Sequence, residues 1–367
     1  MRILQILSST GFHGAEAMAA ELSRQLSFQG LEVDVAVLDN AGTGNDEIFN
    51  VVGEQASACY RIPCNRQLDL QTLSELATRA KDRRIDVIHS HCYKTTFYAG
   101  LLRPWQRFRL VTTYHNWLTH TRALKAYALI DKNLARLNDF SIGVSTPVTS
   151  ELARFVSKAR LSQIDNGIDI QMFRPGTDRI AHRHALGLPS EHPLLGFVGR
   201  LSPEKGLPHL LLALTRPSLS SVHLAIAGDG PERSNIEQLI NKLGLQARVH
   251  LLGYRRDTLN VYHALDGFVL PSTIEAFPMV LLEAMSCGLP VIASNVGEIS
   301  RIIHTDSVGY LTQAGNNESL ADAIEQWLET PSTRDNMGQL ARERVIAQFS
   351  SRAMAHRYAE IYQTVLK

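Results

Sequence analysis

The stretch 267-GFVLPSTIEAFPMVLLEAMSCGLPVIAS-294 contains a complete strand, loop, helix and strand pattern. The apolar run "GFVL" is typical of a short buried strand, and a turn follows from Pro271. Pro278 suits the first position of a helix, which we expect to continue through Leu281–Ser286 before the strand "PVIASN". This order of elements predicts a parallel βαβ unit.

The same alternation of strands and helices extends along the whole chain. A first set of expected strands is "RILQIL", "EVDVAVL", "DVIHSH", "RLVTTYH", "FSIGVS" and "RLSQIDNGID". A second set is "PLLGFVGR", "SVHLAIAGDG", "RVHLLG", "GFVLPS", "PVIASN" and "GYLTQ". Helical patterns lie between the strands, so the sequence predicts an α/β protein with two doubly wound parallel sheets.

The length of 367 residues also favours two domains, because one hydrophobic core rarely grows so large. We expect an N-terminal domain at residues 1–172 and a C-terminal domain at 173–350. The boundary is placed by the segment Phe173–Pro193, which is rich in Pro, Gly and charge. A last helix within 351–367 is expected to pack back toward the N-terminal domain.

Composition excludes several classes of protein. The net charge of +1 argues against a dedicated nucleic-acid binder. Four cysteines in so long a chain do not make a disulfide framework, and the run "HSHC" lacks a second ligand pair for zinc. The opening "MRILQILSS" has too short an apolar region for a signal peptide, and no run approaches the roughly 20 apolar residues of a spanning helix. We therefore expect a cytoplasmic protein with no bound metal.

Polar, Gly-rich clusters follow the expected strands, where open parallel sheets bind their ligands. They are "SSTGFHG", "GRLSPEKG", "AGDGPE", "PSTIEAFP" and "SNVGE". If both domains present these edges to one another, the site is the cleft between them. The dinucleotide fingerprint G-x-G-x-x-G is absent, which argues against a dehydrogenase.

Glu275 and Glu283 are the carboxylates of an otherwise apolar stretch. In a helix that begins near Pro278 they would be separated by roughly 10 Å, comparable to the span of a diphosphate with a sugar at each end. The free N–H groups of Ala276–Met279 would offer an anion site between them. On spacing alone, a solvent-facing Glu283 and a loop charge at Glu275 are an equally good interpretation.

The sequence resembles the retaining glycosyltransferases of family 4, which have the GT-B fold of two facing Rossmann-like domains with an interdomain cleft. The resemblance covers nearly the whole chain and is carried by matching pieces in the family's order. These are "GFHGAE", "VTTYHNW", "GVS", "IDNGIDIQMF", "GRLSPEKG", "AGDGPE", "LLGYRRD", "DGFVLPSTIEAFPMVLLEAMSCGLPVIAS" and "VGE". It implies transfer of a sugar from a UDP- or GDP-sugar with retained anomeric configuration.

The resemblance also implies roles for individual residues. Glu275 would contact the donor sugar, Arg200 and Lys205 the diphosphate, and His115 the region near the sugar. Read without the resemblance, Arg200 and Lys205 fit a solvated basic loop and His115 a satisfied strand-end histidine. The implied donor-binding residues are Gly14, Gly199, Gly228, Gly253, Tyr254, Arg255, Ala276, Phe277, Pro278, Met279 and Glu283.

Two residues depart from the family's pattern. His13 stands where the family often has a glycine before Gly14, and Ala276 stands where a glycine usually follows the first glutamate. Alanine keeps its N–H but disfavours positive φ, so the approach of a phosphate would change slightly. Neither departure removes a charged group, and we expect activity without a metal or other cofactor.

The acceptor is expected on the N-terminal domain and is implied to be a glycan or a lipid-linked glycan. Arg103–Arg109 and Thr121–Leu137 combine basic with apolar residues, which suits docking on an anionic membrane surface. A core-packing amphipathic helix is an equally good interpretation. The expected setting is bacterial surface polysaccharide or lipopolysaccharide biosynthesis, at the inner face of the cytoplasmic membrane. Alternatives are a catalytically silent nucleotide-sugar-binding protein and a nucleotide-sugar 2-epimerase.

Overall fold

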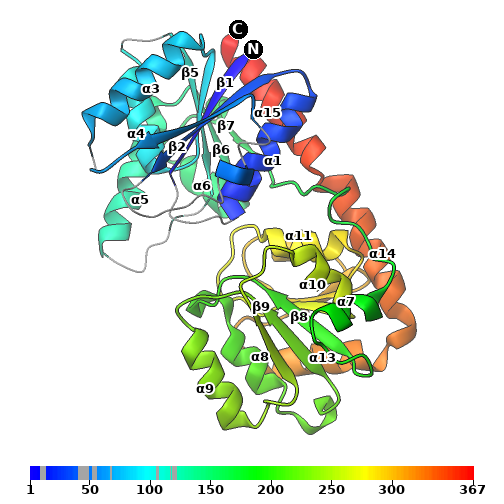
Figure 1. Ribbon diagram of the computed structural model, residues 1–367. Helices are drawn as coiled ribbons and strands as arrows, with labels where there is room; N and C mark the ends of the chain where they lie inside the picture. The colour runs from blue at the N-terminus through cyan, green and yellow to red at the C-terminus, as the bar shows by residue number, and fades with distance from the viewer. Residues whose placement is uncertain are drawn as a thin grey trace. The chain divides into compact units, whose positions relative to one another are not determined.

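The computed structural model describes residues 1–8, 14–39, 49–51, 56–66, 68–104, 107–115, 117 and 122–367. These residues divide into two compact units (Figure 1). Unit 1 consists of Met1–Gly167 together with Ser351–Lys367, and unit 2 consists of Ile168–Ser350. The expected boundary between residues 172 and 173 therefore falls just inside unit 2.

Unit 1 contains a seven-stranded parallel sheet in the order β3-β2-β1-β4-β5-β6-β7. Its strands are β1 Arg2–Ser8, β2 Glu32–Asp39, β3 Ala58–Pro63, β4 Val87–Ser90, β5 Arg109–Tyr114, β6 Phe140–Gly143 and β7 Leu161–Gln163. Its helices are α1 Gly14–Phe28, α3 Leu70–Asp82, α4 Tyr93–Leu102, α5 Arg122–Leu134, α6 Thr146–Leu152 and α15 Ser351–Leu366, with 3-10 turns η1 Ala135–Leu137 and η2 Lys158–Arg160.

Helices cover both faces of this sheet because successive strand residues point to opposite sides. Leu4 of β1 is buried among residues of α3 and α4, such as Leu76 and Tyr98. Ile3, one position earlier, is buried on the other face with Met18 of α1 and residues of α15. Strand β1 is thus apolar on both sides, as expected of a central strand in a doubly wound fold.

The last helix of the chain, α15, belongs to unit 1, where it lies beside α1 (Figure 1). Its buried tyrosines explain this position, since both reach polar groups within the sheet. The hydroxyl of Tyr358 is 3.0 Å from Thr113 Oγ1, and that of Tyr362 is 2.7 Å from His89 Nδ1. The chain therefore returns to its first sheet to complete that sheet's core.

Unit 2 contains a six-stranded parallel sheet in the order β10-β9-β8-β11-β12-β13. Its strands are β8 Leu194–Val198, β9 His223–Ala227, β10 Val249–Gly253, β11 Gly267–Leu270, β12 Val291–Ser294 and β13 Gly309–Thr312. Its helices are α7 Arg179–Ala185, α8 Leu207–Ala213, α9 Arg233–Leu243, α10 Thr258–Ala264, α11 Met279–Ser286, α12 Ile299–Ile302, α13 Asn317–Glu329 and α14 Pro331–Gln348, with 3-10 turns η3 Pro203–Lys205 and η4 Pro217–Leu219.

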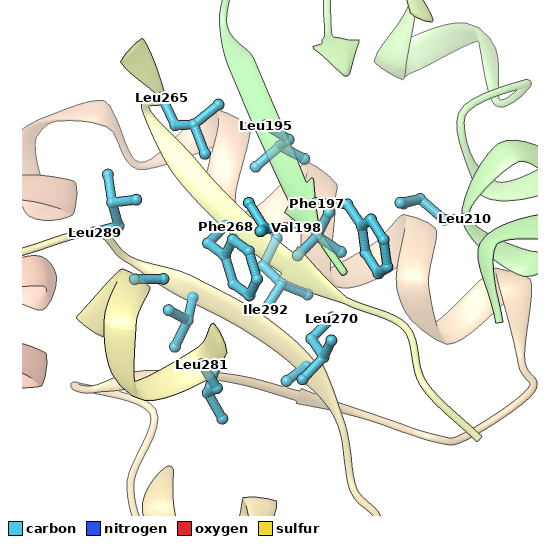
Figure 2. Close-up of a cluster of buried hydrophobic side chains, with 14 of the residues drawn as sticks. Leu195, Phe197, Val198, Leu210, Leu265, Phe268, Leu270, Leu281, Leu289 and Ile292 are labelled. Carbon is cyan, nitrogen blue, oxygen red and sulfur yellow. The ribbon is translucent and has the colours of Figure 1, made fainter. Parts of the chain in front are cut away.

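One hydrophobic core runs through unit 2, and Figure 2 shows its centre. Phe197 of β8, Phe268 of β11 and Ile292 of β12 are fully buried there, with Leu281 of α11 on one face of the sheet. The apolar residues of α11 that made this stretch resemble core helix are therefore core residues. They hold α11 against the strands that precede and follow it.

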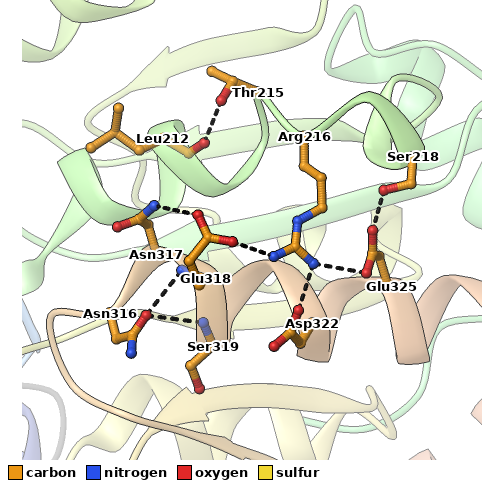
Figure 3. A network of polar contacts seen from close by, with 10 residues as sticks. All are labelled: Leu212, Thr215, Arg216, Ser218, Asn316, Asn317, Glu318, Ser319, Asp322 and Glu325. Carbon is orange, nitrogen blue, oxygen red and sulfur yellow. Dashed lines mark hydrogen bonds and ion pairs between the residues drawn. The ribbon is translucent and has the colours of Figure 1, made fainter.

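Polar contacts fix α13 to the segment after α8 (Figure 3). The guanidinium of Arg216 donates to Glu318 and Asp322 at 2.5 Å and to Glu325 at 2.8 Å. Ser218 also donates to Glu325. The three acceptors lie on one face of α13, where spacings of three and four residues place side chains together. In the described residues, no helix is long and apolar enough to cross a membrane.

Candidate functional site

The strand order of unit 2 reverses between β8 and β11. From β8 the chain proceeds outward to β9 and β10, and from β11 it proceeds in the opposite direction to β12 and β13. The loops after β8 and β11 therefore leave the carboxyl edge of the sheet at the point where the strand order reverses. Open α/β sheets bind their ligands at this topological switch point. The loop Gly199–Gly206 and the loop Pro271–Pro278 are the two that flank it.

An ion pair joins these two loops. Lys205 Nζ lies 2.5 Å from Glu275 Oε1, and the two side chains are 19% and 11% exposed. The same carboxylate oxygen accepts a hydrogen bond of 2.9 Å from the hydroxyl of Ser272, which is fully buried. The sequence placed Lys205 and Glu275 seventy residues apart, and the fold brings them into contact at the switch point.

Backbone contacts also hold the loop Gly199–Gly206 against the loop Pro271–Pro278. Thr273 N donates to the carbonyl of Glu204 at 2.8 Å. Gly206 adopts φ +65°, and a Cβ at this position would lie 2.1 Å from the carbonyl oxygen of Pro271. Gly297, after β12, adopts φ +55°, and a Cβ there would lie 2.0 Å from the carbonyl oxygen of Glu275. Only glycine permits both approaches, so these residues fix the backbone on either side of the ion pair.

Arg200 is exposed on the same loop as Lys205. The neighbouring Glu204 accepts a hydrogen bond of 2.6 Å from Ser202. Burial raises the pKa of Glu204, but this hydrogen bond and the charges of Lys205 and Arg200 outweigh burial and lower the pKa overall. Glu204 is therefore ionised at neutral pH, and the loop carries one carboxylate with its two cations.

The glycines expected to approach a donor lie at consecutive strand ends. Gly199 N donates to Ala227 O at 3.0 Å, and Gly228 N donates to Gly253 O at 2.7 Å. These contacts bring the ends of β8, β9 and β10 together. Tyr254 is 58% exposed beyond β10. The guanidinium of the adjacent Arg255 is occupied by Asp257, to which it donates at 2.8 and 2.6 Å.

Helix α11 begins beside Glu275, one residue later than expected. Pro278 is the N-cap in an extended conformation, and Met279 is the first helical residue. The N-cap side chain makes no capping hydrogen bond, because proline has no acceptor to offer. Ala276 is half-buried, whereas Phe277 and Pro278 are buried. The ring of Phe277 packs against Phe349 in the core, so any contact of Phe277 with a ligand is restricted to its backbone.

Glu283 lies in the second turn of α11 and is partly buried. The hydroxyl of the buried Tyr262 in α10 donates to Glu283 Oε2 at 2.7 Å. Burial raises the pKa of Glu283 to about 7, although the hydrogen bond from Tyr262 opposes this shift. This carboxyl group therefore changes its charge near neutral pH.

Two expected site residues belong to unit 1 and are described with it. Gly14 is the first residue of α1, and residues 9–13, which include His13, lie outside the described part. His115 follows β5 and is half-buried, with Nε2 3.5 Å from Nδ1 of His91 after β4. Burial lowers the pKa of His115 to about 4, so its ring is neutral at pH 7.

Metal binding has no candidate among the described residues. Within residues 1–8, 14–39, 49–51, 56–66, 68–104, 107–115, 117 and 122–367, no three His, Cys, Asp or Glu side chains are grouped to hold an ion. The four cysteines are free, with Cys64 and Cys287 buried.

The fold is shared with solved glycosyltransferases of GT-B architecture. HepE from Anabaena, solved in complex with UDP-glucose, superposes with a TM-score of 0.86 at 23% identity, covering 99% of this chain and 100% of that one. The sequence pattern described as "Glycosyl transferases group 1" matches residues 178–344, and that described as "Glycosyltransferase Family 4" matches residues 12–172.

Curated relatives match over nearly the full length. D-inositol 3-phosphate glycosyltransferase of Corynebacterium diphtheriae is 30% identical over 95% of this chain and 89% of that protein. N-acetyl-alpha-D-glucosaminyl L-malate synthase of Bacillus anthracis is 27% identical over 96% of this chain and 94% of that protein. The chain belongs to glycosyltransferase family 4, as its motifs indicated, and it is a glycosyltransferase with two Rossmann-like parallel-sheet domains.

Three side chains that contact the expected site residues were not predicted from the sequence as part of the site. Ser272 stands three residues before Glu275 in the same turn, a spacing that could have indicated their contact. Tyr262 contacts Glu283 from a separate helix, and no local pattern connects the two. His91 was considered only as a zinc ligand, although its place after β4 puts it at the switch point of the unit 1 sheet between β1 and β4.

Proposed function

We propose that this glycosyltransferase moves a sugar from a UDP- or GDP-sugar to a glycan or lipid-linked acceptor with retention of anomeric configuration. The observation that carries the proposal is the pairing of Lys205 with Glu275 beside the uncapped first turn of α11. A cation and free N–H groups suit a diphosphate, and an adjacent carboxylate suits the hydroxyls of the sugar. The binding of UDP-glucose by HepE, which shares the fold, supports a nucleotide-sugar donor.

Donor binding would replace one set of contacts by another. In the structure, Lys205 and Glu275 satisfy each other's charge. A bound diphosphate supplies Lys205 with a new anion, while the sugar hydroxyls donate to Glu275. Arg200, which is exposed on the same loop, would join Lys205 at the phosphates. Glu283 in the next turn would then accept from the ribose.

The proposed chemistry is a front-face substitution through an oxocarbenium-like state. The acceptor attacks from the face that the leaving nucleotide vacates, and a donor phosphate oxygen takes the acceptor's proton. Lys205, Arg200 and the first turn of α11 stabilise the negative charge that grows on the leaving diphosphate, an effect that is usually large in transfer reactions. No metal ion is required by this arrangement.

The donor is tested in two steps. Thermal shifts with UDP and with GDP identify the base, and a panel of sugars on that base then identifies the transferred group. Proton NMR of the product reports whether the anomeric configuration is retained. A chain that binds nucleotide but transfers to no acceptor and does not hydrolyse donor would be a silent binding protein, and epimerised donor would indicate a 2-epimerase.

The acceptor proposal has two forms, which one acceptor panel separates. A glycan or lipid-linked glycan of bacterial surface polysaccharide or lipopolysaccharide is the first. The second is a small hydroxylated anion, because the names of the two curated relatives contain L-malate and inositol 3-phosphate. Transfer to malate or inositol phosphate, with none to a glycan, would replace the first form by the second.

A peripheral membrane site is proposed on the segments Arg103–Arg109 and Thr121–Leu137. Leu129 and Ile130 of α5 are 58% and 48% exposed, and Arg136, which follows α5 in η1, is exposed as well. Apolar side chains among cations suit an anionic membrane surface. Residues 105, 106 and 121 of these two segments lie outside the described part. Cosedimentation with anionic liposomes tests the site, and absence of binding at low salt would remove it.

A further inference from the structure

A chain of buried polar side chains leads from α1 to His115 within unit 1. Ser23 and Gln5 are completely buried, and His91 is 6% exposed. Gln5 Nε2 is 3.0 Å from Ser23 Oγ, and Gln5 Oε1 is 2.9 Å from His91 Nε2. His91 Nδ1 in turn faces His115 Nε2 at 3.5 Å. Of these residues, only His115 has been given a role at the donor.

The direction of the hydrogen bonds is determined at the Ser23 end. Ser23 Oγ donates its single proton to the carbonyl of Ala19 in its own helix, at 2.8 Å. Ser23 Oγ therefore meets Gln5 as an acceptor, which requires the amide nitrogen of Gln5 on that side. The amide oxygen then faces His91 Nε2. Since this oxygen can only accept, His91 carries its proton on Nε2.

The same reasoning extends to His115. A neutral imidazole has one proton, so His91 Nδ1 is a bare lone pair. Two bare nitrogens facing each other would repel, so the facing nitrogen of His115, Nε2, carries a proton. Burial lowers the pKa of His91 well below its usual range and that of His115 to about 4, so both rings are neutral near pH 7.

The adjacent His89 does not compete for these contacts. Its ring is 4.2 Å from that of His91, measured between centroids, but both of its nitrogens are occupied elsewhere. His89 Nε2 is 2.8 Å from Thr113 Oγ1, and Nδ1 is 2.7 Å from the hydroxyl of Tyr362. The chain from Ser23 to His115 is thus separate from the contacts that hold α15.

We propose that Gln5 and His91 are positioning residues that keep His115 protonated on Nε2, so that Nδ1 of His115 is the ring nitrogen left to accept a hydrogen bond. The family resemblance implies that His115 lies near the donor sugar, and a role for His115 there rests on the proposed function. Which ring nitrogen of His91 and of His115 carries the proton depends on the contacts of unit 1 alone. A sugar hydroxyl would donate to this nitrogen, and a variant that released the tautomer would lose that contact in part of the molecules.

The ¹⁵N spectrum of histidine-labelled, ligand-free full-length protein tests the tautomers of His91 and His115 directly. Protonated and bare imidazole nitrogens have widely different ¹⁵N shifts, and couplings to the ring protons identify each nitrogen. We expect a protonated Nε2 and a bare Nδ1 in both His91 and His115. A bare Nε2 and a protonated Nδ1 in His115 would overturn the proposal, because this is the pattern of a chain running in the reverse direction.

Two variants test the role of Gln5. Gln5→Met keeps the volume but removes the amide, and it should move the nitrogen shifts of His91 and His115 toward the average of the protonated and bare values. The matched control, Thr113→Val, removes an equally buried hydrogen bond beside the series from Ser23 to His115. Among these three histidines, it should change the nitrogen shifts of His89 alone. Unchanged shifts in Gln5→Met would also overturn the proposal. If Gln5→Met does not fold, the wild-type spectrum decides alone.

These readouts need no donor and no turnover. A reversed tautomer in an active enzyme rejects the inference and leaves the proposed function in place. The expected tautomers in a protein that binds neither UDP nor GDP would reject the proposed function instead.

Discussion

Lys205 Nζ lies 2.5 Å from Glu275 Oε1, across the point where the strand order of unit 2 reverses. Both groups are largely buried, so each needs the charge of the other when no ligand is present. A ligand that separates them has to supply an anion to Lys205 and hydroxyl donors to Glu275. A sugar nucleotide contains both, which is why this contact is central to the proposed site.

Replacing Lys205 by alanine should remove most of the turnover. The loss of one preorganised charge at a developing anion lowers kcat by about 100- to 1000-fold in enzymes. Steady-state kinetics with the identified donor measure the effect. Lys242→Ala removes an exposed lysine of the same unit and should leave kcat unchanged.

A charge exchange separates catalysis from stability in this pair. Lys205→Glu places two carboxylates together and should lower the unfolding temperature. Adding Glu275→Lys restores an ion pair and should recover much of that loss, whereas activity should stay absent because the cation now stands on the other loop. Recovery of activity in the double variant would contradict the assigned roles.

Donor affinity should rise with pH through about 7, the pKa to which burial raises the carboxyl group of Glu283. Below this pH the group is protonated in the folded protein, and above it the carboxylate accepts better from the ribose. Calorimetry with UDP or GDP between pH 6 and 8 measures the change. We expect a change of about tenfold, since a hydrogen bond to a charged group contributes about 1.4 kcal/mol more than one to a neutral group.

Glu283→Gln is the reference for this titration. It has no titrating carboxyl group, but the phosphates of the ligand titrate equally in both proteins. Its affinity should vary less with pH than that of the wild type. Tyr262→Phe removes the hydrogen bond that stabilises the carboxylate, so its midpoint should move to higher pH. Identical pH profiles in all three proteins would show that Glu283 does not meet the ligand.

Ionisation of Glu283 also affects stability, with a definite sign. Its pKa is about 7 in the folded protein and 4.5 ordinarily, so the folded state holds the proton more tightly. The contribution of this group to the free energy of unfolding therefore decreases as pH rises from about 4.5 to about 7. Glu283→Gln should be less sensitive to pH in this window when unfolding is measured with urea.

Tyr362 should stabilise unit 1 through both its ring and its hydroxyl. The side chain is fully buried, and its hydroxyl contacts His89. Tyr362→Phe should lower the free energy of unfolding by about 0.5–1.5 kcal/mol, as expected for one hydrogen bond. Tyr362→Ala should cost about 3–5 kcal/mol, because it leaves a cavity in the core. Urea unfolding measures both.

Gln363→Ala, on the exposed face of the same helix, is the control. Its effect should stay within about 0.5 kcal/mol. An equal cost for Gln363→Ala and Tyr362→Ala would show that α15 is not held by this buried face.

Chelation should leave the reaction intact. In the proposed mechanism, the positive charge near the diphosphate comes from Lys205, Arg200 and the first turn of α11. Activity in excess EDTA should therefore equal the activity without it. Loss of activity in EDTA, with recovery on addition of Mg²⁺ or Mn²⁺, would contradict the metal-free mechanism.

The fold class could be predicted from the sequence because its signals are local. Runs such as "GFVL" and "PVIAS" are short, apolar and bounded by turn residues, and β11 and β12 occupy them. The start of α11 was predicted one residue early, because Pro278 is compatible with both the first helical position and the N-cap. The sequence pattern cannot separate these positions, which differ in the backbone conformation of one residue.

The contacts within the site could be predicted only in part. Glu275, Lys205 and Arg200 were singled out by chemical type and by their place after strands, but the pairing of Lys205 with Glu275 depends on the strand order. The partner of Glu283 is Tyr262, from a helix that precedes β11. Such contacts arise from tertiary packing, and the raised pKa of Glu283 follows from that packing rather than from its neighbours in sequence.

A crystal structure of the chain with bound UDP-sugar or GDP-sugar tests the central claim most directly. The account predicts the diphosphate against Lys205 and the first N–H groups of α11, with sugar hydroxyls at Glu275 and ribose hydroxyls at Glu283. A donor bound elsewhere, with Lys205 and Glu275 still paired at their present distance, would contradict it.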